Sequence, residues 1–594
     1  MNNINKLTAM FAAACFLSAS AASAQDIKVT RSGDTTIVKI TNPKKYLILP
    51  VEETKDESHV LLSTGSPADT WMDVRLARQK TDYCVPFALG NGKTATVKIL
   101  NISPDALALK NLTMSDTWSV ENTDYYRPLY HHTPSYGWMN DANGMVYKDG
   151  EYHLYFQYNP YGSKWGNMHW GHAVSTDLMH WKELQPAIAR DTMGHIFSGS
   201  SVVDKNNTAG YGNGAIIALY TSASDKNGQI QCMAYSTDNG RTFTKYEGNP
   251  VLRPFDGLKD FRDPKVFWYA PGKHWCMILA VGQHMEIYSS FNLKEWKKES
   301  EFGAMQGAHG GVWECPDMVE IPVEGTREKK WVLICNLNPG GPFGGSAAQY
   351  FIGSFDGKKF VNEFPTQTKW LDWGKDNYAT VTWNNAPDGR CVALGWMSNW
   401  QYANNVPTRQ YRSANTIARD LTLYREGGEL YLKSTPSPEI KKARGEKVSV
   451  PAFKVAGQYE VASLLKDNEG AYEIEMVIQN EGASKIAFSL LNDKGDKVYM
   501  YYDVPRKQFV MDRSQSGKVD FSSDFPAVTV APVTADGEMT LRLFVDHSSI
   551  EAFGEDGKFV MTNLVFPSAP YNKLLFESDK EGYKVKTLQV HTLQ

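Results

Sequence analysis

A repeated motif in the middle of the chain limits its fold more than any other feature. Each copy is a serine, then a turn with Asp or Asn, then an aromatic residue, and it follows a β run such as 230–235. The four copies lie at 175–181, 236–243, 289–296 and 354–360. Their aromatic ends fall 62, 53 and 64 residues apart (181 to 243, 243 to 296, 296 to 360). A period of this length predicts a β-propeller with four-stranded blades, larger than the ~40–45 residues of a WD40 blade.

Five chemically unusual clusters follow the same period. They are Asn140-Asp141, Phe-Ser-Gly-Ser at 197–200, Phe-Arg-Asp-Pro at 261–264, Trp-Glu-Cys-Pro-Asp at 313–317 and Tyr-Ala-Thr-Val-Thr-Trp at 378–383. Measured at positions 141, 198, 263, 314 and 379, the intervals are 57, 65, 51 and 65 residues. Because the innermost strands of successive blades converge on one axis, the clusters predict five blades and one axial pocket.

Three of these clusters carry an acid, at Asp141, Asp263 and Glu314. Like charges in one pocket raise one another's pKa, so one carboxyl stays protonated while another is ionised. Glycoside cleavage needs that pair, as a nucleophile and a general acid. We expect Arg262 to hold Asp263 ionised. The alternatives are an Asx-turn at Asp141, a surface ion pair at Arg-Asp-Pro and a strand end at Glu-Cys-Pro-Asp, but the shared period favours a site.

These motifs together resemble glycoside hydrolase family 32, the family of invertases, inulinases and levanases, and in particular its bacterial exo-type fructan hydrolases. The matching motifs are Trp-Met-Asn-Asp-Ala-Asn-Gly at 138–144, Gln-Tyr-Asn-Pro at 157–160, Trp-Gly-His-Ala-Val-Ser at 170–175, 197–200, 261–264, Glu314-Cys315, 395–403, 412–421 and, near the C-terminus, 544–553. The resemblance covers residues 125–594.

The resemblance implies a fold, a reaction and a set of roles. The fold is all-β, with a five-bladed propeller followed by a β-sandwich, and the reaction is retaining hydrolysis of β-fructofuranosides. Asp141 is the nucleophile at C2, Glu314 the general acid and base, and Asp263 the transition-state stabiliser. The substrate-contact positions are Asn140, Gln157, Trp165, Phe197, Ser198 and Arg262, with Trp396 and Trp400 as candidates for an apolar wall.

One residue departs from the family motif. Ala142 stands where the family usually has proline, so we expect a looser loop with no loss of a catalytic group.

Five histidines near these motifs could suggest a metal site. They stand at 131, 132, 153, 169 and 172, and their spacings follow no ligand pattern. We therefore predict no metal and no cofactor, with hydrogen-bonding roles for the histidines.

We expect five segments along the chain. They are a signal peptide at 1–24, a small N-terminal β-rich domain at 25–122, the catalytic propeller at 123–432, a linker at 433–449 and the C-terminal β-sandwich at 450–594. The N-terminal domain carries no cluster of catalytic type, which favours a scaffold over a carbohydrate-binding accessory. Asp546 and Glu551 are expected to be structural.

Export is predicted from the N-terminus. Lys6, the apolar run 7–17 and the small residues 22–24 form a signal-peptide pattern, and lipid attachment at Cys15 is the weaker alternative. We therefore expect a periplasmic or extracellular protein.

No later apolar run is long enough for a membrane helix, and 62 basic against 66 acidic residues exclude a nucleic-acid footprint. The remaining six cysteines are expected to be mostly buried thiols, and the protein a monomer or weak oligomer.

The predicted function is release of terminal β-D-fructofuranosyl units from levan, inulin or both, and from sucrose. The segment 395–403 resembles that of exo-acting enzymes, which favours the exo mode. An endo-acting hydrolase and a fructosyltransferase of the same fold are the alternatives, and a fructan-binding protein is the non-enzymatic one. All three acids are present, which favours an enzyme.

Overall fold

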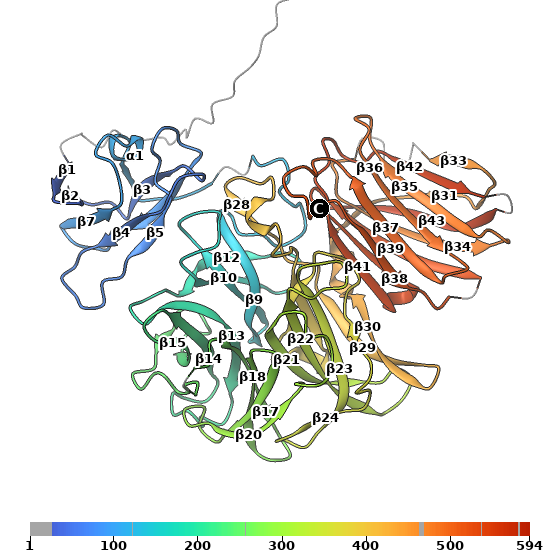
Figure 1. The fold of residues 1–594 in the computed structure, drawn as a ribbon, viewed down its shortest axis with the longest axis horizontal. Coiled ribbons are helices and arrows are strands. Elements are labelled where there is room, and N and C mark those ends of the chain that lie inside the picture. The colour runs from blue at the N-terminus through green and yellow to red at the C-terminus, as the bar shows by residue number, and fades with distance from the viewer. Residues whose placement is uncertain (1–25, 121–122, 256, 462–467, 536, 580–581) are drawn as a thin grey trace, which may run out of the picture. The chain divides into compact units, whose positions relative to one another are not determined.

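The computed structural model describes residues 26–120, 123–255, 257–461, 468–535, 537–579 and 582–594 (Figure 1). The predicted signal peptide and Cys15 lie outside the described residues. The chain divides into two compact units between Ser119 and Val120. Strands dominate both units, and the described residues contain one short α-helix, α1 (Leu107–Lys110), so the all-β prediction is confirmed.

The N-terminal unit consists of two antiparallel sheets. One has the order β1-β2-β7-β4-β5 and the other β6-β3-β8. The strands are β1 (Ile27–Ser32), β2 (Thr35–Thr41), β3 (Tyr46–Val51), β4 (Ser58–Leu62), β5 (Met72–Val74), β6 (Tyr83–Ala88), β7 (Thr94–Leu100) and β8 (Thr113–Ser115). β2 and β7 alternate between buried and more exposed residues, as expected of strands with one face on a core.

The second unit begins with five antiparallel sheets in sequence, which are the blades of the propeller. Blade 1 is β12-β11-β10-β9, blade 2 β13 to β16, blade 3 β17 to β20, blade 4 β21 to β24, and blade 5 β26-β27-β29-β30. Blade 1 consists of β9 (Gly137–Lys148), β10 (Glu151–Asn159), β11 (His169–Ser175) and β12 (Lys182–Ile188), and blade 2 consists of β13 (His195–Asp204), β14 (Ala215–Ser224), β15 (Gly228–Ser236) and β16 (Thr244–Lys245). Blade 3 consists of β17 (Phe261–Tyr269), β18 (His274–Val281), β19 (His284–Ser290) and β20 (Lys297–Phe302), and blade 4 consists of β21 (Val312–Pro322), β22 (Lys329–Asn338), β23 (Ala347–Phe355) and β24 (Phe360–Asn362), with β25 (Lys369–Trp370) paired to β23. Blade 5 consists of β26 (Tyr378–Thr382), β27 (Val392–Trp396), β29 (Arg419–Glu426) and β30 (Glu429–Pro436).

The blades close into a ring. The innermost strands β9, β13, β17, β21 and β26 contact one another in turn, and β26 contacts β9. Five hydrophobic clusters fill the spaces between neighbouring blades, and one of them joins blade 5 to blade 1 through Leu394 and Leu154. β28 (Tyr411–Arg412) pairs in parallel with β9, which adds a backbone link across the closure.

The C-terminal part is a sandwich of two sheets, with the orders β31-β43-β34-β39-β40-β41 and β33-β42-β35-β36-β37-β38 (Figure 1). Its strands are β31 (Arg444–Val450), β32 (Phe453–Val455), β33 (Gln458–Val461), β34 (Tyr472–Asn480), β35 (Lys485–Leu491), β36 (Lys497–Asp503), β37 (Gln508–Gln515), β38 (Val528–Pro532), β39 (Glu538–Asp546), β40 (Ser549–Gly554), β41 (Phe559–Leu564), β42 (Lys573–Ser578) and β43 (Tyr583–Leu593). Ile474 and Leu543 from one sheet and Phe488 and Met500 from the other share one core. Residues 433–449, expected as a linker, contain the end of β30, the 3₁₀ helix η3 (Pro438–Ala443) and most of β31.

Buried charges join the sandwich to the propeller. His131, before blade 1, lies between Asp546 and Glu551 of the sandwich, at 2.8 and 2.7 Å. Arg419 of β29 binds Glu551 at 2.6 Å and Asp372 at 2.9 Å. Asp546 and Glu551 are thus structural, as predicted.

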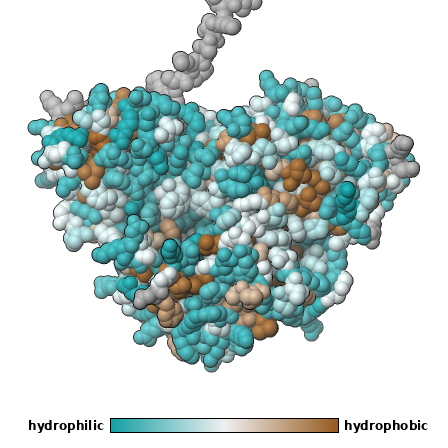
Figure 2. All heavy atoms as spheres, viewed as in Figure 1, coloured by the Kyte–Doolittle hydropathy of each residue, from teal (hydrophilic) through white to brown (hydrophobic). Residues whose placement is uncertain are grey.

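Three further observations concern the surface, the helices and the cysteines. Hydrophilic residues cover most of the face in view in Figure 2, with apolar residues in small separate patches. Among the described helices, none has the length and apolar content to cross a membrane. Five cysteines are buried free thiols: Cys232, Cys276, Cys315, Cys335 and Cys391.

Candidate active site

The innermost strand of every blade is irregular at the cluster that follows the sequence period. Register shifts occur around Asn140-Asp141, Phe197-Ser198, Asp263-Pro264, Cys315-Pro316 and Ala379-Thr380. Three of these residues have positive φ: Asp263 at 67°, Cys315 at 43° and Ala379 at 50°. A bulge leaves a residue unpaired and redirects its side chain. Five bulges near the start of five converging strands therefore bring five clusters to one end of the axis.

Asp141, on β9, is held by three donors. Asn140 Nδ2 donates to Oδ1 at 3.1 Å, and Ser198 Oγ donates to Oδ2 at 2.7 Å. The Cys315 thiol also donates to Oδ2, at 3.3 Å. Burial and the charge of Glu314 raise the pKa of Asp141, while the three donors lower it. The donors therefore favour the ionised form, the form that a nucleophile needs.

Asp263, on β17, is 5% exposed and accepts the backbone N–H of Cys315 at 2.8 Å. Burial raises the pKa of Asp263 to about 7, with smaller contributions from the charges of Glu314 and Asp141, while Arg262 and the Cys315 N–H oppose the rise. Arg262 favours the ionised form of Asp263, as predicted from the sequence, but burial and the other two acids together outweigh this effect. The physical reason is that Arg262 makes no close hydrogen bond to Asp263, and its Nε lies 4.0 Å from Oδ2.

Glu314, on β21, has both carboxylate oxygens bound. Arg262 Nη2 donates to Oε1 at 2.9 Å, and the Tyr378 hydroxyl donates to Oε2. Arg262 also binds Asp260 at 2.7 Å. Three acids from blades 1, 3 and 4 thus lie within one network, in which Cys315 contacts both Asp141 and Asp263.

Of the polar residues predicted to contact substrate, Asn140, Ser198 and Arg262 bind the acids directly, whereas Gln157 binds the backbone nearby. Asn140 accepts the Trp138 indole N–H at 2.8 Å and binds Asp141. Gln157 is buried and donates to the Ile196 carbonyl at 3.0 Å. Arg262 and Ser198 bind acids directly. Gln157 therefore fixes the backbone beside Phe197 and makes no hydrogen bond to an acid among the described contacts.

The predicted aromatic residues form an exposed layer and a buried one. Trp165 is 38% exposed, stacks on His195 at 5.7 Å and meets Phe197 edge-on. Trp400 is partly buried and packs with Trp396 at 4.8 Å. Trp396 is fully buried, so its ring belongs to the buried layer and packs behind Trp400.

The histidines near the motifs bind other parts of the fold. His132 bonds Asn415 at 2.7 Å, His153 bonds His172 at 3.1 Å, and His169 bonds the Asn167 carbonyl. Burial lowers the pKa of His132, His153 and His169 to about 4. They are therefore neutral near pH 7, and none of their described hydrogen bonds reaches the three acids.

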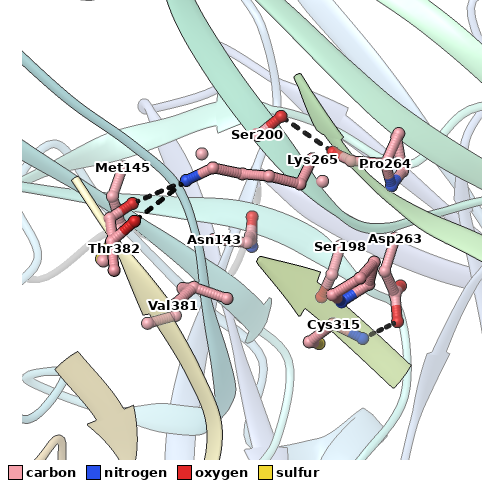
Figure 3. Close-up of a pocket in the computed structure, with 14 residues that line it drawn as sticks. Asn143, Met145, Ser198, Ser200, Asp263, Pro264, Lys265, Cys315, Val381 and Thr382 are labelled. Carbon is pink, nitrogen blue, oxygen red and sulfur yellow. Dashed lines mark hydrogen bonds between the residues drawn. The ribbon is translucent and has the colours of Figure 1, made fainter. Parts of the chain in front are cut away.

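A small cavity lies next to Asp263 (Figure 3), and its volume is ≈ 10 Å³. This is about the size of one water molecule. Asp263, Cys315 and Asn143 line it, and both amide atoms of Asn143 are buried without a hydrogen-bond partner among the described residues. Below Asp263, Lys265 Nζ donates to Asp317 Oδ2 at 2.9 Å and to the Thr382 carbonyl at 3.0 Å. Blades 3, 4 and 5 are therefore joined directly under the site.

The structure places in this network four residues for which the sequence predicts no role. Cys315 and Tyr378 contact the acids, and Lys265 and Asp317 form the ion pair beneath them. Cys315, Asp317 and Tyr378 stood inside clusters already marked by the period, and Lys265 follows one directly. Their position next to an acid was the available signal, but the direction of each side chain depends on the bulges.

Paired carboxylates with different environments, set at the end of a five-bladed propeller, define a glycoside hydrolase site. The comparisons agree. The model of the glycosyl hydrolases family 32 N-terminal domain matches residues 131–434, and that of the family 32 C-terminal domain matches 439–592. A domain of unknown function matches 32–130.

Relatives and solved structures point to the same family. A levanase of Bacillus subtilis (strain 168) is 46% identical over 81% of this chain and 73% of its own length. An extracellular exo-inulinase of Aspergillus awamori is 36% identical over 77% and 92%. The crystal structure of exo-inulinase from Aspergillus awamori matches with a TM-score of 0.74 at 34% identity, over 79% of this chain and 98% of that one. The β-fructofuranosidase from Schwanniomyces occidentalis complexed with fructosyl-erythritol matches with a TM-score of 0.73 at 34% identity, over 80% and 99%.

The chain belongs to glycosyl hydrolase family 32 and is a glycosidase. The five-bladed propeller and C-terminal sandwich expected from the sequence are confirmed.

Proposed function

We propose that this protein is an exported exo-hydrolase that releases terminal β-D-fructofuranosyl units from fructans and sucrose with retention at C2. The observation that carries the proposal is the meeting of Asp141, Asp263 and Glu314, each with a different set of partners. The levanase and exo-inulinase relatives support levan or inulin as the polymer. The extracellular inulinases among them support export.

Each acid has one role in the proposed double displacement. Asp141 attacks C2 while the bond from C2 to the leaving oxygen breaks, and Glu314 gives that oxygen its proton. Glu314 then takes a proton from water, whose oxygen attacks C2 and releases Asp141. Asp263 binds the fructosyl hydroxyls as positive charge develops on the ring.

The other predicted contacts shape the subsite. Asn140 and Ser198 hold Asp141, and Arg262 holds Glu314. Trp165 and Phe197 offer aromatic surface for the sugar's C–H faces, with Trp400 as the remaining wall residue and Trp396 behind it. Gln157 fixes the backbone next to Phe197. We assign no metal or cofactor to this mechanism, which needs none.

We propose that the chain is divided into five segments. Residues 1–24 would direct export, 25–122 form a scaffold, 123–432 carry the reaction, 433–449 connect, and 450–594 form the sandwich. The break between Ser119 and Val120 and the family matches at 131–434 and 439–592 support this division.

The test is the identity of the first products from levan, inulin and sucrose. Free fructose alone from the polymers is the expected result, and mixed oligomers would indicate an endo-acting enzyme. Transfer products at high sucrose would indicate a fructosyltransferase. Binding of fructan without any release of sugar would overturn the enzymatic proposal.

A further inference from the structure

A short segment between blades 4 and 5 lies along the edge of the sandwich. Trp373 N donates to the Val560 carbonyl at 2.8 Å, and Asp376 N donates to the Thr562 carbonyl at 3.0 Å. β41 is the last strand of its sheet, so residues 372–376 cover its unpaired edge. A Cβ on Gly374 would lie 1.9 Å from the Thr562 carbonyl oxygen, so the two backbones approach more closely than any side chain allows.

The two aspartates of this segment anchor it further. Asp372 accepts the Thr562 backbone N–H at 2.9 Å, and Asp376 accepts that of Leu564 at 2.7 Å. Asp376 also forms an ion pair with Arg513 of β37, and both side chains are buried. Tyr402 completes the group, since its hydroxyl donates to Asp376 and accepts from Arg513 Nη2 at 2.8 Å.

The anchored segment leads directly to the acid. Tyr378 follows Asp376 by two residues, is 1% exposed, and donates its hydroxyl to Glu314 Oε2. The intervening Asn377 is fixed by its hydrogen bond to Thr380 at 2.9 Å. The direction of the Tyr378 phenol is therefore set by the backbone that leaves Asp376.

We propose that Asp376 and Arg513 are positioning residues for the general acid: the sandwich holds Asp376, and Asp376 aims Tyr378 at Glu314. The inference rests on the proposed function, in which Glu314 protonates the leaving oxygen. With Arg262 on Oε1 and Tyr378 on Oε2, the carboxyl group has one orientation. Losing the Tyr378 contact frees Oε2, and the cost falls on the step in which Glu314 transfers its proton. The sandwich thus contributes to the reaction as well as to stability.

Two substrates that differ in their need for a general acid distinguish the positioning role of Asp376 from a purely structural role. The glucose oxygen of sucrose must be protonated as it leaves, whereas fluoride leaves β-D-fructofuranosyl fluoride with much less help from an acid. We expect Asp376→Asn to lower kcat/KM for sucrose about tenfold more than kcat/KM for the fluoride, since general acids contribute roughly 10²–10⁴-fold. A smaller folded fraction would lower both values equally.

Two further variants keep the test decisive. Tyr402→Phe retains the Asp376–Arg513 ion pair and removes one hydrogen bond to Asp376, so it serves if Asp376→Asn does not fold. Lys433→Met is the matched control, because Lys433 joins Glu324 of the propeller to Asp556 of the sandwich away from residues 372–378. The control is expected to change both substrates equally.

Equal losses on the two substrates in folded Asp376→Asn or Tyr402→Phe protein, with an active wild type, would overturn the positioning role alone. A wild type that cleaves neither sucrose nor the fluoride would overturn the proposed function, and the positioning role with it.

Discussion

Arg262 binds Glu314 at 2.9 Å, whereas its Nε lies 4.0 Å from Asp263, its neighbour in sequence. The Arg262 guanidinium therefore holds the carboxylate of Glu314, the proposed general acid, in place. Asp263 is left buried, with its pKa raised to about 7 by burial and by the charges of Glu314 and Asp141. The group of three carboxylates thus retains one proton up to near-neutral pH.

This arrangement predicts how activity depends on pH. Below about 7 the cluster holds its proton, so kcat/KM for sucrose is expected to fall as pH rises through about 7. Arg262→Gln removes the charge that lowers the pKa of Asp263, and the fall is expected to move up by about one pH unit at a lower overall rate. Asp260→Asn, which leaves the Arg262–Glu314 pair in place, is the control. A fall that stays in place or moves down in Arg262→Gln would contradict this account.

The Cys315 thiol predicts an effect on the acidic side of the profile. It donates to Asp141 Oδ2 at 3.3 Å and lowers the pKa of Asp141 against the effects of burial and Glu314. Cys315→Ala is therefore expected to move the acidic limb of kcat/KM to higher pH and to reduce kcat about tenfold, as for loss of a hydrogen bond to a charged group. Cys315→Ser retains a donor and is expected to recover part of the loss. An unchanged acidic limb in Cys315→Ala would exclude this role.

Much of this architecture follows from the period of the sequence. The spacing of Asp141, Asp263 and Glu314 places them in blades 1, 3 and 4, and converging strands bring them together. The partner of Arg262 does not follow from sequence, because bulges and positive φ at Asp263 and Cys315 redirect adjacent side chains. The burial of Trp396 likewise depends on Trp138 and Trp400, which pack against it from distant segments.

The ion pair beneath the acids predicts a stability effect. Lys265 and Asp317 are 5% and 0% exposed at the side chain, and removing one partner leaves the other buried and unpaired. Lys265→Met is expected to lower the free energy of unfolding by about 3–5 kcal/mol. The double variant Lys265→Met/Asp317→Leu is expected to lose much less than the sum of the two single changes, as measured by urea denaturation. Additive losses would show that the two side chains are not coupled.

The contact between propeller and sandwich predicts a pH-dependent stability. Burial disfavours the charged form of His131, but hydrogen bonds to Asp546 and Glu551 outweigh it and raise the pKa of His131 from 6.5 to about 9. The resulting stability is fully present below pH 6.5 and is lost as pH rises through about 9.

The matching variant is His131→Asn. The difference in free energy of unfolding between wild type and variant is expected to shrink by on the order of 3 kcal/mol over that pH range. A difference that does not change with pH would mean that His131 is not charged in the folded protein.

The most direct test of the account is the identity of the residue that carries the sugar during turnover. Glu314→Gln protein would be treated with β-D-fructofuranosyl fluoride, whose fluoride leaves with little acid assistance, while the missing base slows release of the fructosyl group. Peptide mass spectrometry is predicted to find one added fructosyl unit, on Asp141. A fructosyl unit on another residue, or rapid turnover to a product inverted at C2, would contradict the account.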